Sequence, residues 1–230
     1  MYKNKILWIA SLTFILVLIV AGSQMAYFPG DIAITNTVQF LTPNSEGWAK
    51  AITATAKMPL RLVLLAITFG LAWLLSGWIA SVLSMVSYGV AFVVGDFVLK
   101  PGIARPRPDP ELINVVGSPG GFTMPSTFAI IYTSTLGFIL ILALVTNKQS
   151  KPVRLAIAAI CGLLILIGGT ARVTLGAHWP SDVILAYLVA GMWALFLIEV
   201  VLPKLNKAIG PKDNRASSLE REESNEKVKY

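Results

Sequence analysis

The only histidine of this 230-residue chain, His178, lies between two long apolar segments. Arg172 precedes it by six residues and Asp182 follows it by four. Ionisable residues at such places are costly and usually functional. An arginine can bind phosphate oxygens, and an imidazole can attack phosphorus when a carboxylate holds its other nitrogen in the protonated form. The alternative is an interfacial histidine beside an aromatic belt residue, Trp179. The spacing favours a phosphate site with His178 as nucleophile and Asp182 as its orienting partner.

A second cluster of charges lies in segment 100–108, which contains Lys100, Arg105 and Arg107 among three prolines. Asp96 precedes Lys100 by four residues, a spacing that pairs the two across one helical turn. The prolines end the helix and hold the following chain extended, so guanidinium groups are presented for bidentate contact with phosphate. Anchoring to lipid headgroups is the alternative. Three cations in eight residues favour an anion site with Lys100 and Arg107 as ligands.

A third cluster is the glycine-rich segment 117–125, which leads into Ser126 and Thr127 at the start of an apolar segment. The N-terminus of a helix exposes unpaired N–H groups and the positive end of the helix dipole. We expect Ser126, Thr127 and the neighbouring amides to hold a phosphoryl oxygen. The alternative is that Ser126 only caps the helix.

The composition places these clusters in a membrane protein. Hydrophobic residues make up 55% of the chain, charged residues 13%, and the mean hydropathy is +0.71, which is too apolar for a soluble domain. Six apolar segments approach the roughly 20 residues that cross a bilayer: 6–26, 60–79, 80–99, 126–146, 155–170 and 182–202. We predict an all-α fold, an integral membrane six-transmembrane-helix bundle.

The predicted bundle forms one domain over residues 1–202, and a charged, disordered tail occupies 203–230. Residues 27–59 are expected to include an interfacial helix. The first apolar segment has a second interpretation, a signal peptide, because lysines precede it and Ala21-Gly22-Ser23 follow. Its apolar run is longer than the core of a usual signal peptide.

The distribution of basic residues predicts the orientation of the bundle. They gather before the first segment, after the fourth and after the sixth, at Lys3, Lys5, Lys148, Lys151, Arg154, Lys204, Lys207, Lys212 and Arg215. The positive-inside rule places these regions, and both termini, in the cytoplasm. Residues 27–59, 100–125 and 171–181, with all three clusters, then lie on the extracytoplasmic face. We predict a multi-pass protein of the plasma membrane of a bacterium.

Other classes of function are disfavoured. The net charge of +7 reflects anchoring, and no soluble basic domain with interleaved aromatic residues supports nucleic-acid binding. Cys161 is the only cysteine and lies in an apolar segment, which excludes disulfides and a cysteine-based metal site. A transporter is disfavoured because the acidic residues near the spans, Asp96 and Glu199, lie at segment ends. We expect no metal and no cofactor. The expected partners are the bilayer and a phosphorylated lipid, and the oligomeric state is left open.

Together the clusters resemble the type 2 phosphatidic acid phosphatase family of membrane lipid phosphatases. Its signature is Lys-x6-Arg-Pro, then Pro-Ser-Gly-His, then Ser-Arg-x5-His-x3-Asp. Over about 57–200 this chain matches it with Lys100, Arg107-Pro108, Pro125-Ser126, Arg172, His178 and Asp182. The resemblance implies a metal-independent phosphatase acting on lipid phosphates at the outer face. It also implies that His178 forms a phosphohistidine, that Asp182 orients it, and that Lys100, Arg107, Ser126 and Arg172 hold the phosphoryl group.

The chain departs from this signature at the second motif, where Thr127-Phe128 replaces Gly-His, and at Ala171, which replaces serine. The family's histidine there is the general acid that protonates the leaving alkoxide, which phenylalanine cannot do. General acid catalysis contributes roughly 100- to 10,000-fold, so we expect a slow enzyme. A lipid diphosphate, such as polyprenyl diphosphate, has a better leaving group and needs the proton less. The alternative is a catalytically impaired pseudophosphatase that binds, senses or transports phosphorylated lipids.

Overall fold

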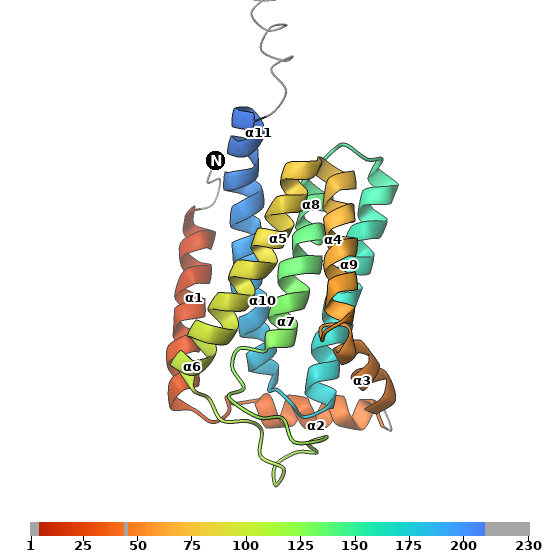
Figure 1. Cartoon of the computed structure of the whole chain (residues 1–230). Helices are drawn as coiled ribbons and strands as arrows, with labels where there is room; N and C mark the ends of the chain where they lie inside the picture. The colour runs from red at the N-terminus through yellow and green to blue at the C-terminus, as the bar shows by residue number, and fades with distance from the viewer. Residues whose placement is uncertain (1–4, 44–45, 210–230) are drawn as a thin grey trace, which may run out of the picture.

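The computed structural model describes residues 5–43 and 46–209, and every regular element in these ranges is helical (Figure 1). The all-α prediction is therefore confirmed. The helices are α1 (Lys5–Gln24), α2 (Asp31–Leu41), α3 (Glu46–Ala54), α4 (Leu60–Ser76), α5 (Trp78–Val93), α6 (Lys100–Ile103), α7 (Thr127–Tyr132), α8 (Phe138–Val145), α9 (Lys151–Thr174), α10 (Pro180–Phe196) and α11 (Leu202–Ile209). Three π-helical turns, Val94–Leu99, Thr133–Gly137 and Leu197–Val201, join α5 to α6, α7 to α8 and α10 to α11.

The predicted six-helix membrane bundle is present. Among the described residues, five continuous helices are long and apolar enough to cross a membrane: Lys5–Gln24, Trp78–Ile103, Thr127–Val145, Lys151–Thr174 and Pro180–Ala208. The remaining predicted segment forms the shorter apolar helix α4, of 17 residues. Gly77, with a φ of 103°, makes the tight turn between α4 and α5.

Two predicted boundaries differ from the structure. The fifth segment was expected at 155–170, but α9 has 24 residues. The prediction stopped at the charged residues Arg154 and Arg172, which in the structure are part of the helix. The last span continues through α11 to Ile209, so residues 203–209 are helical where the predicted tail begins. The rest of that predicted tail, 210–230, lies outside the described residues.

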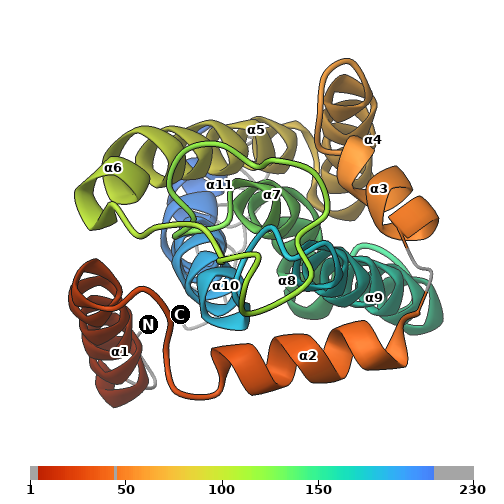
Figure 2. The ribbon, with the colours of Figure 1, turned by 90° about the horizontal axis from the view of Figure 1, so that it is seen from below.

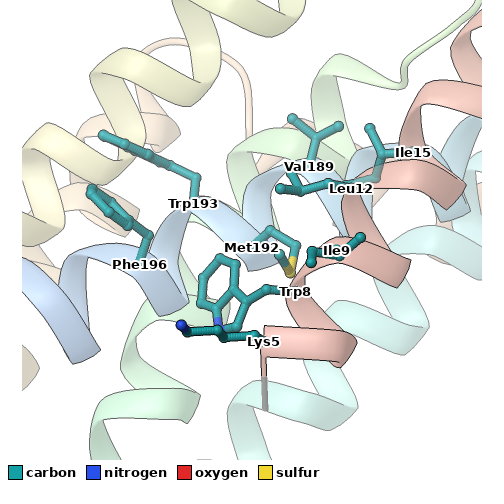
Figure 3. A pocket seen from close by; sticks show the side chains of 9 residues that line it. All are labelled: Lys5, Trp8, Ile9, Leu12, Ile15, Val189, Met192, Trp193 and Phe196. Atoms are coloured by element: carbon teal, nitrogen blue, oxygen red, sulfur yellow. The ribbon is translucent and has the colours of Figure 1, made fainter. Parts of the chain in front are cut away.

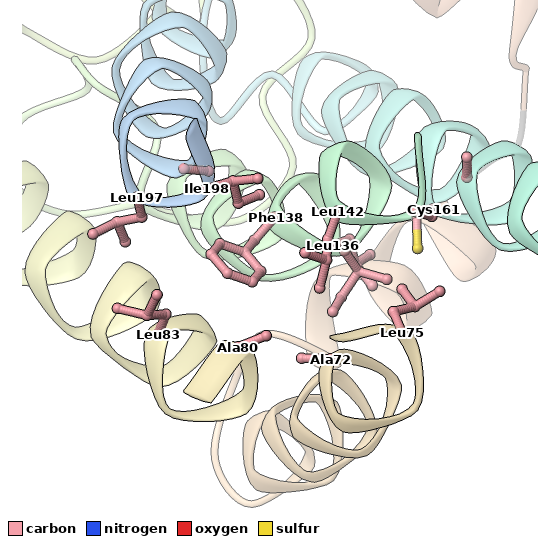
Figure 4. Packing of buried hydrophobic residues seen from close by; sticks show 14 of the residues in the cluster. Ala72, Leu75, Ala80, Leu83, Leu136, Phe138, Leu142, Cys161, Leu197 and Ile198 are labelled. Carbon is pink, nitrogen blue, oxygen red and sulfur yellow. The ribbon is translucent and has the colours of Figure 1, made fainter. Parts of the chain in front are cut away.

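The helix formed by α7 and α8 occupies the centre of the bundle. In its most apolar window 78% of the residues are buried, whereas the figure for α1 is 11%. A helix that is apolar on all sides is suited to such a central place. Its side chains Leu136, Phe138 and Leu142 belong to a cluster that includes Leu75 of α4 and Leu83 of α5 (Figure 4). The central helix is thus enclosed by protein rather than by lipid.

The connecting segments divide between the two ends of the bundle. At the lower end in Figure 1, α2 and α3 lie beside the loop 104–126, and Figure 2 shows this loop arching below α7 and α10. The loop 175–179 between α9 and α10 is at the same end. The upper end holds the start of α1, the α8–α9 loop and α11. The three predicted clusters therefore share one end, and the basic segments lie at the other.

A glycine allows the close packing of α9 against α10. A Cβ atom at Gly169 would overlap the Tyr187 hydroxyl and lie 2.9 Å from Val183. The same hydroxyl donates a hydrogen bond of 2.6 Å to the carbonyl of Ile165. A methyl group at this position must therefore displace the side chain that joins the two helices.

We expect Gly169→Ala to lower the free energy of unfolding by about 1–3 kcal/mol, the usual cost of overpacking. The matched control is Gly70→Ala in α4, where an added Cβ meets no atom within 4 Å; it should leave the stability unchanged or raise it, since alanine favours helix. Thermal unfolding of the purified protein in detergent measures both variants. Equal midpoints for Gly169→Ala and wild type would contradict this interpretation of the packing.

Candidate active site

The imidazole of His178 is buried, 2% exposed, and Thr123 and Arg107 contact its nitrogens. Nδ1 lies 3.2 Å from the hydroxyl oxygen of Thr123. Nη1 of Arg107 lies 3.0 Å from Nε2 and 3.4 Å from Nδ1. A guanidinium can only donate, and the Thr123 hydroxyl donates to Asp182, so Nδ1 donates to Thr123 and Nε2 is the acceptor nearer to Arg107. The ring thus has one nitrogen whose proton fixes its orientation and one whose lone pair faces a cation.

Asp182 lies in the first turn of α10, which begins at Pro180. Its Oδ2 accepts a hydrogen bond of 2.8 Å from the backbone N–H of Trp179 and so caps the helix. We expected a direct hydrogen bond from His178, but Nδ1 and Oδ2 are 3.6 Å apart. The Thr123 hydroxyl lies between them, because it contacts Nδ1 and donates to Oδ2 at 2.6 Å. The orientation of the imidazole therefore passes through Thr123, which sequence reasoning did not single out.

Arg105 is buried between two carboxylates. Its Nη1 donates to Oδ1 of Asp182 at 2.6 Å, and its Nη2 donates to Oδ2 of Asp31 at 3.0 Å. The guanidinium carbon also lies 4.5 Å from the centre of the Phe28 ring. We grouped Arg105 with the cations presented to phosphate, but with 1% exposure and these partners it serves the protein interior.

Asp31, the first residue of α2, completes this network. Its Oδ1 accepts from the backbone N–H of Ser181 at 3.1 Å, and its Oδ2 accepts from the Ser181 hydroxyl at 2.7 Å. The bonded residues are 150 positions apart, so no local pattern in the sequence indicates the contact. Asp31 fastens α2 to the start of α10 and thereby positions Arg105 from a second side.

Arg107 joins the glycine-rich segment 117–125 to the loop 175–179, which contains His178. Nη1 donates to the carbonyl of Ala177 at 2.7 Å, and Nη2 donates to the carbonyl of Gly120 at 3.0 Å. Burial lowers the pKa of this guanidinium, and the negative charges of Asp182 and Asp96 oppose that change. Arg107 is therefore held beside His178 by backbone carbonyls, within electrostatic reach of two carboxylates.

Arg172, near the end of α9, differs from the other site cations. Within the described part of the chain its side chain makes no hydrogen bond or ion pair, and its Nε is buried without a partner. Its guanidinium carbon lies 5.9 Å from the centre of the Phe128 ring. A buried guanidinium in this state can accept an anion without first breaking a salt bridge.

Lys100, Ser126 and Thr127 meet where α6 approaches the start of α7. Lys100 pairs with Asp96 at 2.7 Å, as predicted, and also contacts the Thr127 hydroxyl. Ser126 is fully buried, and its hydroxyl accepts from the backbone N–H of Ala129 at 3.5 Å. In the structure Ser126 thus caps α7, and the residue closest to the Lys100 ammonium is Thr127.

The surroundings of His178 keep its imidazole neutral. Burial lowers its pKa to about 3, and the positive charges of Arg172 and Arg107 act in the same direction, while the nearby carboxylate of Asp182 opposes them. A neutral imidazole with a protonated Nδ1 has a lone pair on Nε2. At neutral pH the ring is therefore uncharged beside two cations, which is the form in which an imidazole is able to act as a nucleophile.

Phe128 occupies the place where the signature has its second histidine. Its ring is 5% exposed, with its centre 4.2 Å from that of Tyr132, and it forms an apolar wall beneath Arg172. It offers no proton. Among residues 5–43 and 46–209, no three His, Cys, Asp or Glu side chains converge as a metal site would require.

Comparison with known families decides the classification. The model of the PAP2 superfamily matches residues 65–205, which include all three clusters. The chain belongs to the PAP2 superfamily. No curated protein sequence matches it. Among solved structures, the crystal structure of the first transmembrane PAP2 type phosphatidylglycerolphosphate phosphatase from Bacillus subtilis matches with a TM-score of 0.68 and 20% identity, covering 91% of this chain and 98% of that one.

The PAP2 match confirms the family resemblance and the membrane phosphatase fold. The matched range also shows which of the contacts described above lie within the family's segment of the chain and which lie outside it. Thr123, Phe128 and Arg105 lie inside the matched PAP2 range, whereas Asp31 precedes it. The helix that supplies Asp31 thus braces the PAP2 site from outside the matched segment.

The bridging position of Thr123 predicts the protonation pattern of the imidazole. The chain has one histidine, so ¹⁵N-histidine labelling of a protein without a histidine tag gives one imidazole spectrum. In wild type we expect protonated Nδ1 and unprotonated Nε2. Thr123→Val removes the hydroxyl and should change the tautomer populations, whereas Thr123→Ser should keep them. A tautomer unaffected by valine would contradict the bridging role, even if that variant unfolds at a lower temperature.

The same labelled protein tests the electrostatics of His178. With a folded pKa of about 3, the imidazole should stay neutral as the pH falls from 7 to 4, whereas in the denatured chain it should titrate near 6.5. The unfolded state then binds one more proton in this interval, so His178 lowers the stability of the fold as the pH decreases. Titration of the His178 imidazole near pH 6.5 in the folded protein would contradict the effect that burial and the neighbouring arginines have on its pKa.

Proposed function

We propose that this PAP2 protein is a membrane lipid-phosphate phosphatase that works through a phosphohistidine at His178. The observation that carries the proposal is the two-sided environment of the imidazole. Thr123 and Asp182 hold Nδ1, and Nε2 faces Arg107 with Arg172 close enough to influence its charge. An anion site alone requires neither a neutral histidine nor a carboxylate that orients it.

The proposed reaction has two displacement steps. The lone pair of Nε2 forms a bond to phosphorus, the bond from phosphorus to the leaving oxygen breaks, and that oxygen departs with the electron pair. Water then attacks the phosphohistidine, the P–N bond breaks, and inorganic phosphate leaves while the electron pair returns to Nε2. Arg107 and Arg172 would bind the non-bridging oxygens and stabilise the charge that develops on them. In the free protein Arg107 donates to Nε2, so phosphate binding must draw this donor away.

The proposed substrate class follows from the leaving group. A phosphate monoester expels an alkoxide, which needs a proton that Phe128 cannot supply. A lipid diphosphate, such as polyprenyl diphosphate, expels a lipid monophosphate, which is stable without that proton. Lys100 at the start of α6 contacts Thr127 at the start of α7, and both would bind the departing phosphate. The amides after Ser126 would add the positive end of a helix dipole.

We further propose that the site faces the outside of the cell. The end of the bundle opposite His178 carries the basic residues of α1, of the α8–α9 loop and of α11, and the positive-inside rule assigns such an end to the cytoplasm. Attaching a reporter enzyme after α11 and another in the 104–126 loop would give opposite signals if this is so. The same signal from both would overturn the assignment.

A second candidate function is favoured by one observation. Phe128 fills the general acid position with a ring that packs on Tyr132, so a phosphate pocket without turnover is also consistent with the site. Such a protein would bind, sense or transport phosphorylated lipids. The two candidates differ in whether phosphate is released.

Phosphate release by the purified protein separates the candidates. We expect wild type to hydrolyse a polyprenyl diphosphate faster than phosphatidic acid, and His178→Ala to hydrolyse neither. Phe128→His should restore a proton donor and raise the rate on phosphatidic acid by about 100-fold or more, with a smaller gain on the diphosphate.

The pattern across the two substrates provides the control. A gain of equal size on both would mean that Phe128→His repairs packing rather than proton transfer. Equal or reversed preference of wild type would reject the diphosphate proposal. Binding of both lipids with no release, by wild type and by Phe128→His, would establish the pseudophosphatase.

A further inference from the structure

A groove separate from the phosphate site lies between α1 and α10 (Figure 3). Its volume is about 680 Å³, which is within the range of pockets that hold small ligands. It is lined by Lys5, Trp8, Ile9, Leu12 and Ile15 of α1 and by Val189, Met192, Trp193 and Phe196 of α10. Eight of these nine side chains are apolar or aromatic, and Lys5 supplies the one charge.

The groove exists because α1 and α10 are in contact along only part of their length. In the half nearer the His178 end, Ile15 of α1 and Leu185 of α10 pack with Ile103 and Met124. An added Cβ at Gly22 would meet the Met124 side chain at 2.5 Å, which shows how closely α1 approaches there. In the other half the groove opens between the two helices (Figure 3). The packed half lies between the groove and His178, so the groove is not a part of the phosphate site.

The chemistry of the groove suits a phospholipid. Its walls belong to two membrane-crossing helices, where only an apolar chain can replace the missing protein contacts. Lys5 is exposed at the first residue of α1 and, within the described residues, forms no ion pair. Trp8 lies one turn further in, a depth at which tryptophan is enriched in membrane proteins. Lysines near a membrane surface attract anionic lipids.

We propose that this groove binds one anionic phospholipid from the leaflet opposite the His178 site. An acyl chain lies between α1 and α10, along Leu12 and Met192, and the headgroup contacts the Lys5 ammonium. The ligand is a resident lipid and not the substrate, because it enters from the other membrane surface.

Native mass spectrometry of the full chain in detergent tests the site with two probes, dioleoyl phosphatidylserine and dioleoyl phosphatidylcholine. We expect one phosphatidylserine to be retained about fivefold more tightly than phosphatidylcholine, the preference that one lysine near the surface provides. Lys5→Gln should remove this preference. Lys151→Gln, which removes the same charge at the same end on α9, away from α1 (Figure 2), should keep it.

A second pair of variants tests the apolar part of the groove. Leu12→Trp places a large ring in the groove and should reduce retention of both lipids, whereas Leu16→Trp, on the same helix but outside the groove lining, should not. Both positions are exposed, so neither change disturbs the protein core. Equal retention of the two lipids by wild type, or equal losses from Lys5→Gln and Lys151→Gln, would overturn the proposal. Dissociation of a dimer by Leu12→Trp, with lipid retention unchanged, would show instead that a second copy covers the groove.

Discussion

The guanidinium of Arg105 lies between the carboxylates of Asp31 and Asp182, away from water, and the geometry of the site depends on this contact. It joins three segments that no continuous helix connects: the start of α2, the loop after α6 and the start of α10. Breaking a buried pair by removing one partner typically costs about 3–5 kcal/mol, because the remaining charge is left without compensation. Here the removal of Arg105 would leave two carboxylates without their cation, and one of them, Asp182, lies beside His178. The loop geometry is thus stabilised by charge as well as by packing.

The same contact determines what the imidazole can do. One oxygen of Asp182 accepts from Arg105, and the other accepts from Thr123 and from the Trp179 amide, so both oxygens are held by neighbouring groups of the site. Thr123, whose hydroxyl is held by Asp182, in turn fixes the orientation of Nδ1 of His178. The other nitrogen faces cations, which disfavour a second proton on the ring. A donor and an acceptor placed before the substrate arrives are what electrostatic preorganisation requires.

Residue spacing was a good guide where contacts are local. The pairing of Asp96 with Lys100 was predicted from a four-residue spacing and is present. The cap at Ser126, which was the alternative considered for that residue, joins residues three positions apart and is also present. Long-range contacts left no such pattern. Thr123 meets His178 across 55 positions, and Arg105 meets Asp182 across 77.

The ends of the helices show a related limit of sequence reasoning. Charged residues at a span end can lie inside the helix when their side chains find partners, as Arg154 does with carbonyl groups at the end of α8. A prediction from hydropathy alone, 155–170, was therefore shorter than the helix α9 in the structure. Sequence reasoning singled out His178 and the cations around it, but only the folded chain showed that Arg105 is buried between two carboxylates and that the Nε of Arg172, within the described residues, has no hydrogen-bond partner.

The central claim is that Nε2 of His178 becomes covalently bonded to phosphorus, and the direct measurement is to trap that intermediate. The protein is mixed with a lipid diphosphate, quenched in base to protect the P–N bond, digested and analysed by mass spectrometry. The account predicts a phosphoryl group on the peptide that contains His178, lost in acid and formed within the first turnover. Release of phosphate in the first turnover without any phosphorylated His178 would contradict it.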